Sequence, residues 1–415
     1  MTSPLLSVDE ARHRILSGVA ILPQETIPLQ HAQGRLLSRA LSARRTQPPV
    51  DVSAMDGYAL KTEDLTKPKG LRLIGESAAG HGFEGLLGEG ETVRIFTGAP
   101  VPKGADAVLL QEDALRSEDG MIHPRESLFS GENIRQKGLD FSEGQAALPA
   151  GAKLGPAELA LAAAMNHAEV SVVRRPRIAI MASGDELVLP GNNPGPNQII
   201  ACNSFAVAGL AREAGAEVLD LGLFKDDLEQ LQLGISQARA LKVDILVTLG
   251  GASVGDHDLL RPALVEQGMK LDFWRIAMRP GKPLIYGALG DMRILGLPGN
   301  PVAAFVCSLV FLAPLIRALQ GDPQASEVQM EPAFIGSDLP ANKSRRDYMR
   351  ASLTRDADHR LIATPQPLQD SSLLTELTQS QALLVREAGA PATMKGDPCS
   401  IIRLDRKSTR LNSSH

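Results

Sequence analysis

The sequence predicts an α/β protein of several domains, organised around a doubly wound, mostly parallel sheet. At 415 residues the chain is too long for one hydrophobic core, so two to four domains are expected. Strands alternate with amphipathic helices between Arg177 and Leu249, which is typical of βαβ units. Short alternating segments separated by glycine and proline flank this region and indicate smaller β domains.

The central stretch is an apolar run from Val243 to Leu249, which predicts a strand buried on both faces. The loop that follows it carries Gly250, Gly251, Ser253, Asp256 and Asp258. Glycines let the backbone approach a ligand, and the hydroxyl and carboxylates suit a phosphate, a metal ion or both. On this segment alone, an ordinary strand-to-helix turn with an aspartate cap explains the pattern equally well.

Composition and charge exclude several classes of protein. A hydrophobic content of 43% with 22% charged residues is that of a soluble globular protein, and we expect a cytoplasmic location. The longest apolar stretch, Pro301 to Leu315, is shorter than a bilayer span and predicts a buried helix, so we expect no membrane segment. A net charge of −5 without a long basic block argues against nucleic-acid binding. The three cysteines form no C-x-x-C pair and predict reduced thiols.

The flanking segments predict three smaller parts. Residues 7–34 have apolar side chains at helical spacing behind a Ser7/Glu10 capping box, so one or two helices are expected. The expected strands of the β region that follows are Leu71 to Ile74, Glu91 to Phe96, Ala107 to Gln111 and Ala114 to Ile122. Pro156 to Asn166 predicts a helix, and the chain beyond Pro323 predicts a small C-terminal β domain.

The polar loops divide into two chemical groups. Carboxylates lie at Asp56, Asp140, Glu186, Asp226, Asp256 and Asp258, and cations lie at Arg275, Arg279, Lys282 and Arg350. Carboxylates beside glycine loops suit Mg²⁺, and the basic residues can hold phosphate. The loop Gly296 to Pro301 precedes a helix and offers its amides to an anion. An Asp-Gly hairpin turn is the simpler interpretation of residues 53–59.

Six motifs occur in an order that resembles one known family. They are Ser53-Ala-Met-Asp-Gly-Tyr-Ala59, Thr97-Gly-Ala-Pro-Val-Pro102, Ser183-Gly-Asp-Glu-Leu187, Gly250 to Asp258, Pro280-Gly-Lys-Pro283 and Gly296 to Val302. Each motif alone is weak evidence, but the six together make chance agreement improbable. From Leu6 to Leu404, the chain resembles the molybdopterin molybdenumtransferases, or MoeA proteins, which are similar to the E domain of gephyrin.

This resemblance implies a four-part homodimer. We expect an N-terminal helical domain (1–46 and 141–174), an inserted β domain (47–140), a MogA/MoaB-like α/β domain (175–322) and a C-terminal β-barrel-like domain (323–405). Residues 406–415 are expected to be a disordered or non-native tail. The implied reaction takes adenylylated molybdopterin and molybdate, cleaves the pyrophosphate bond with Mg²⁺, and releases AMP. Contact with a MogA-like adenylyltransferase is also implied.

The resemblance also assigns roles to residues. The implied catalytic residues are Asp56, Thr97, Asp140, Glu186, Asp258, Arg279 and Lys282, and the implied metal ligands are Glu186, Asp226 and Asp258. The implied ligand-binding residues are Ser183, Gly184, Gly250, Gly251, Ser253, Arg275, Gly296, Pro298, Gly299, Asn300, Arg350 and Ser371. Arginine stands at 275 and 279 where the family often has lysine, and either Ser371 or Ser372 can face the ligand.

Two other functions fit parts of the sequence. A molybdopterin adenylyltransferase or a CinA-like pyrophosphatase has a similar α/β domain but lacks the segment around Asp56. A gephyrin-like scaffold is the alternative without catalysis. An assay for AMP release distinguishes an enzyme from a scaffold.

Overall fold

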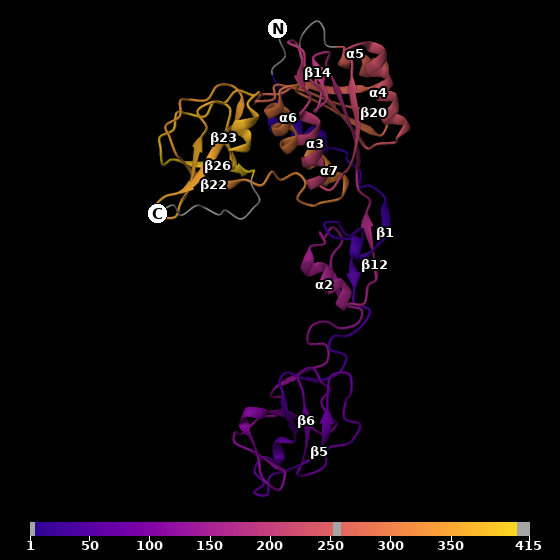
Figure 1. The fold of residues 1–415 in the computed structure, drawn as a ribbon, viewed down its shortest axis with the longest axis vertical. Coiled ribbons are helices and arrows are strands. Elements are labelled where there is room, and N and C mark those ends of the chain that lie inside the picture. The colour runs from indigo at the N-terminus through magenta and orange to yellow at the C-terminus, as the bar shows by residue number, and fades with distance from the viewer. Residues whose placement is uncertain (1–4, 252–258, 405–415) are drawn as a thin grey trace. The chain divides into compact units, whose positions relative to one another are not determined.

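The computed structural model describes residues 5–251 and 259–404 (Figure 1). The chain divides into two compact units, one formed by Met1–Glu25 with Val173–His415 and the other by Thr26–Val172. The division falls within a two-stranded sheet of β1 (Gln24–Pro28) and β12 (Glu169–Val173).

The Thr26–Val172 unit contains a six-stranded sheet in the order β7-β4-β6-β5-β9-β8. Its strands are β4 (Gly57–Leu60), β5 (Leu71–Ser77), β6 (Glu91–Ile95), β7 (Ala107–Leu110), β8 (Ala114–Arg116) and β9 (Met121–Pro124). The predicted strands are confirmed, although the last one divides into β8 and β9. The hairpin interpretation of residues 53–59 is wrong: β3 (Val52–Ser53) pairs with β10 (Ile134–Arg135), whereas β4 pairs with β6 and β7.

Residues 7–34 contain one α-helix, which agrees with the prediction of one or two helices. Helix α1 (Val8–Leu16) starts where expected, because the Ser7 hydroxyl accepts from the Glu10 N–H at 3.2 Å. The Glu10 carboxylate pairs with Arg14 instead of completing the capping box. Residues 24–28 form β1, which pairs with the distant β12, and only one 3₁₀ turn follows. The predicted second helix is α2 (Pro156–Ala164), which begins with proline at its first turn.

The α/β region contains the predicted, mostly parallel sheet. Its order is β16-β13-β17-β21-β20-β18, with parallel pairing as far as β21 and antiparallel pairing beyond. The strands are β13 (Arg177–Ser183), β16 (Glu217–Phe224), β17 (Ile245–Leu249), β18 (Lys270–Arg275), β20 (Pro283–Leu289) and β21 (Met292–Leu297). All five residues of β17 are buried, as the apolar run predicts.

Helices cover both faces of this sheet. They are α3 (Asn203–Glu213), α4 (Leu228–Ala240), α5 (Leu260–Glu266), α6 (Pro301–Cys307) and α7 (Ala313–Leu319), and one π-helical turn joins α6 to α7. Pro301–Leu319 is long and apolar enough to cross a membrane by composition, with a mean hydropathy of 2.3. However, 72% of it is buried, and Phe311 and Leu315 lie in the main core. The prediction of a buried core helix is confirmed.

A closed β-barrel forms the C-terminal region, as expected. Its strands are β22 (Glu331–Ile335), β23 (Arg346–Arg355), β24 (Leu361–Pro365), β25 (Ala382–Arg386) and β26 (Pro398–Arg403). The barrel closes because β23 pairs with both β24 and β25. A short strand of the α/β region, β19 (Met278–Arg279), pairs in parallel with the start of β23. This pairing fixes the barrel beside the basic loop before β20.

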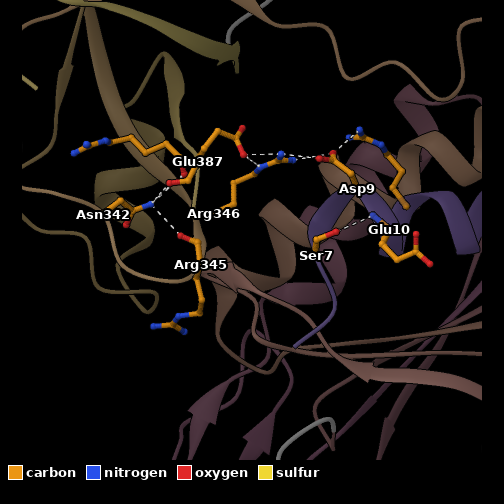
Figure 2. A network of polar contacts seen from close by, with 9 residues as sticks. Ser7, Asp9, Glu10, Asn342, Arg345, Arg346 and Glu387 are labelled. Carbon is orange, nitrogen blue, oxygen red and sulfur yellow. Dashed lines mark hydrogen bonds and ion pairs between the residues drawn. The ribbon is translucent and has the colours of Figure 1, made fainter. Parts of the chain in front are cut away.

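Charged side chains strengthen the attachment of the barrel (Figure 2). Arg346 donates to both carboxylate oxygens of Asp9 on α1, at 2.9 and 2.7 Å, and its Nε donates to Glu387 at 2.7 Å. The Arg346 hydrogen bonds hold the pKa of Asp9 below its ordinary value. Helix α1 and two barrel segments therefore share one ionic network.

Candidate active site

A cavity of about 850 Å³ lies where strands β13, β17 and β21 end. Its polar and glycine-loop lining contains Ser183, Glu186, Asp226, Gly250, Gly251, Arg279, Lys282, Pro298, Gly299, Asn300, Arg345, Asp370, Ser371 and Ser372. Ligands commonly bind at the carboxyl ends of parallel strands. The barrel contributes one wall, so the cavity lies between two parts of the same unit.

One wall of the cavity is acidic. Burial raises the pKa of Asp226, and the charges of Asp185 and Glu186 raise it further, whereas a hydrogen bond from Ser183 lowers it. The Asp226 N–H also donates to the Asp185 carboxylate at 3.3 Å. The charges of Asp185 and Glu186 add to the effect of burial in disfavouring ionised Asp226, which a bound cation would favour.

Backbone segments that approach each other closely shape the floor of the cavity. Gly250 has a φ of +92°, and a Cβ there would lie 2.5 Å from the Ser183 carbonyl oxygen. The Asn203 side-chain amide donates to the Gly299 carbonyl at 2.7 Å, which holds the loop before α6. The Asn300 amide donates to the Ser371 hydroxyl at 2.9 Å. The N-terminus of α6 and the barrel loop therefore meet at the cavity.

Another part of the cavity lining, the basic wall, carries cationic side chains. Arg279 forms an ion pair with Asp347, which is buried, and burial raises the pKa of that carboxyl group. The Arg279 side chain is 52% exposed, so it can also reach a ligand. Lys282 and Arg345 line the same wall. Figure 2 shows the side chains of Arg346, the first residue of β23, and of Arg345, just before it, pointing in different directions, so these adjacent arginines have different environments.

A separate polar group lies in the Thr26–Val172 unit. One oxygen of Asp56 accepts hydrogen bonds from the Thr97 N–H and the Thr97 hydroxyl, both at 2.7 Å. These bonds hold the pKa of Asp56 below its ordinary value. Asp140 lies after β10, and its N–H donates to the Gln47 carbonyl at 3.0 Å.

Three models of protein families match the sequence. "MoeA N-terminal region (domain I and II)" matches residues 6–166, "Probable molybdopterin binding domain" matches 179–318, and "MoeA C-terminal region (domain IV)" matches 333–404. The molybdopterin molybdenumtransferase of Haemophilus influenzae is 33% identical, with 96% of this chain and 98% of that protein covered. The chain belongs to the molybdopterin molybdenumtransferase family.

Further relatives agree with this assignment. The molybdopterin molybdenumtransferase of Nostoc sp. is 34% identical over 97% of this chain and 94% of its own. A crystal structure of a molybdopterin biosynthesis moea protein from Pyrococcus horikosii superposes with a TM-score of 0.82 at 27% identity. That superposition covers 97% of this chain and all of that one. The fold predicted for a MoeA-type chain is thereby confirmed.

Several predicted site residues do not line the cavity of this MoeA-type chain. Arg350 is 1% exposed and donates to the carbonyls of Asp370 and Leu368, at 2.9 and 2.8 Å. Arg275 stacks on Trp274, with Cζ 3.9 Å from the ring centroid. Gly184 and Gly296 act through close packing, because a Cβ there would lie 2.6 Å from Glu186 Oε2 and 2.9 Å from Ile285 Cβ, respectively.

The predicted metal ligands are only partly described. One of the three, Asp258, falls in residues 252–258, outside the described residues, as do the ligand-binding candidate Ser253 and the candidate carboxylate Asp256. Within residues 5–251 and 259–404, no three His, Cys, Asp or Glu side chains are grouped to hold a metal ion. Arg345 was not predicted as a site residue; the signal that could have found it is the arginine pair Arg345-Arg346 at the start of β23.

Proposed function

We propose that this chain inserts molybdenum into molybdopterin, the activity named for its relatives in Haemophilus influenzae and Nostoc. The substrates are adenylylated molybdopterin and molybdate. The single observation that carries the proposal is that one cavity is lined both by acidic side chains, Glu186 and Asp226, and by basic side chains, Arg279 and Lys282. A diphosphate with a divalent cation needs both kinds of wall.

The proposed reaction is hydrolysis of the diphosphate bond, coupled to transfer of molybdenum. Water adds to phosphorus, the P–O bond to the adenylate breaks, and AMP leaves while molybdopterin keeps its own phosphate. Arg279 and Lys282 stabilise the charge that develops on the phosphoryl oxygens.

The residues of the acidic wall fit Mg²⁺. Two carboxylates and the Ser183 hydroxyl form a set of oxygen donors. Burial, and then the charges of Asp185 and Glu186, raise the pKa of Asp226, and a bound cation would favour its ionised form. Glu186 and Asp226 would hold the ion, with Asp258 as the third proposed ligand. Bound Mg²⁺ would neutralise phosphate charge and orient the diphosphate.

The inserted β domain supplies the remaining proposed residues. The inserted β domain of the partner subunit is proposed to orient the ligand with its Asp56 carboxylate, which accepts two hydrogen bonds from Thr97, and with Asp140. We propose that the chain acts as a homodimer in the cytoplasm, and that a MogA-like adenylyltransferase supplies its substrate. Analytical ultracentrifugation of the purified protein tests the dimer.

The decisive assay supplies adenylylated molybdopterin and Mg²⁺, with and without molybdate, and measures AMP and pterin-bound molybdenum. The transferase produces both products when molybdate is present. A pyrophosphatase would release AMP without incorporating molybdenum, and a scaffold would do neither. Either of those two results would refute the proposed transfer.

A further inference from the structure

Arg94 of β6 contacts both chain segments that carry the Asp56–Thr97 pair. It lies directly opposite Tyr58 of β4 in the antiparallel pairing of the two strands. Its Cζ lies 5.0 Å from the ring centroid of Tyr58 and 5.0 Å from that of Phe96. Tyr58 follows Asp56 by two residues, and Phe96 directly precedes Thr97. One guanidinium is therefore attracted to an aromatic ring on each of the two segments.

The N–H donors of Arg94 hold the backbone around Asp56. Nη1 donates to the Gly57 carbonyl at 3.2 Å, and Nη2 donates to the Gln111 side-chain oxygen at 2.6 Å. The Gln111 N–H in turn donates to the Asp56 carbonyl at 3.1 Å. The carbonyls of Asp56 and Gly57 are thus both tied to Arg94, one through Gln111 and the other directly.

The charge of Arg94 also acts on the Asp56 carboxylate. The Thr97 hydrogen bonds lower the pKa of Asp56 most, burial opposes them, and the Arg94 charge lowers it further. Asp56 and Thr97 are exposed, whereas Arg94 is half-buried. A ligand can therefore reach the carboxylate, while the arginine supports the segments that hold it.

We infer that Arg94 is a positioning residue for Asp56, which fixes the Asp56 and Thr97 segments in the geometry that presents the carboxylate to the ligand. Its planar guanidinium stacks on the two rings and donates in two directions at once, which a lysine ammonium group does not reproduce. Arg94 acts on the reaction only through Asp56. The inference rests on the proposed function for the role of Asp56, but the positioning itself can be measured without substrate.

NMR on the full-length protein compares the wild type with R94Q, R94K and R72Q. In R94Q the pKa of Asp56 should rise towards its ordinary value, and the Thr97 amide should exchange about tenfold faster, because its hydrogen bond to Asp56 is less well held. R94K keeps the charge but not the planar stack, so the Asp56 pKa should stay low while exchange at Thr97 still increases. R72Q removes an arginine that pairs with Glu91 in the same sheet, and it should leave both quantities unchanged.

The AMP assay then measures the effect on the reaction. R94Q should lower kcat/KM by about tenfold, because a misplaced carboxylate orients the ligand less well. The acidic limb of its pH profile should move to higher pH, since Asp56 must be ionised and its pKa is raised. A role of Arg94 in sheet stability alone would move neither the pH profile nor the Asp56 pKa.

The inference is overturned if R94Q has both the wild-type Asp56 pKa and the wild-type exchange rate at Thr97. If circular dichroism shows that R94Q is unfolded, R94K decides, and wild-type exchange at Thr97 in R94K counts against positioning. Altered pKa and exchange with a wild-type kcat/KM would uphold the positioning and reject the proposed role of Asp56. A wild-type protein that releases no AMP would reject the proposed reaction alone, because the NMR measurements need no substrate.

Discussion

Replacing Arg350 by methionine should loosen the barrel loop that lines the cavity. The guanidinium is almost fully buried and donates to two backbone carbonyls, at 2.9 and 2.8 Å. These carbonyls belong to Leu368 and Asp370, directly before the loop serines. The structure therefore gives Arg350 a positioning role, although the sequence had predicted a ligand contact.

The magnitude follows from the two carbonyls that lose their donors. Each of these part-buried hydrogen bonds has a charged donor and contributes about 1.5–3 kcal/mol. Removal of the buried guanidinium offsets part of this loss of stability, because burial disfavours its charge and lowers the pKa of Arg350. We expect a net loss of about 3 kcal/mol in the local stability of the barrel.

Hydrogen exchange measured by mass spectrometry tests this expectation. Amides of β23, β25 and the loop at 368–372 should exchange about a hundredfold faster in R350M. R355M, at the exposed end of the same strand, should change exchange by only a small factor. Unchanged hydrogen exchange in R350M, together with lost ligand binding, would refute the positioning role. It would instead favour direct contact between Arg350 and the ligand.

Three further predictions concern other parts of the chain. In T97V, loss of the Thr97 hydroxyl donor should raise the pKa of Asp56 towards its ordinary value. Asp56 should therefore protonate at higher pH in an NMR titration, and an unchanged pKa would show that the hydroxyl does not lower it. A double-mutant cycle of D9N and R346M should give a coupling energy of about 1–3 kcal/mol, and stability from this pair should be lost as the pH falls through the lowered Asp9 pKa. Additive effects would disprove the coupling. Asp347→Asn should raise KM more than it lowers kcat, because Arg279 loses its ion-pair partner. Wild-type KM and kcat in this variant would show that Asp347 does not position Arg279.

The central sheet was predictable because its local signals are strong. The alternation from Arg177 to Leu249 specifies parallel strands, and the glycines at 250–251 and 299 must then gather at one edge. β1 was not predictable, because its partner β12 is distant in sequence and its apolar spacing also suits a helix. Sequence gives the charge of Arg345 and Arg350 but not their burial, which depends on the closed barrel.

The central claim is that molybdenum transfer takes place at the basic wall of the cavity. The most direct measurement is pterin-bound molybdenum formed per minute by K282Q and by K270Q, which changes an exposed lysine on β18. The account predicts that K282Q slows transfer by about a hundredfold, since one charge-stabilising donor is lost, while K270Q retains wild-type activity. Equal rates in the two variants, with both proteins folded, would contradict the account.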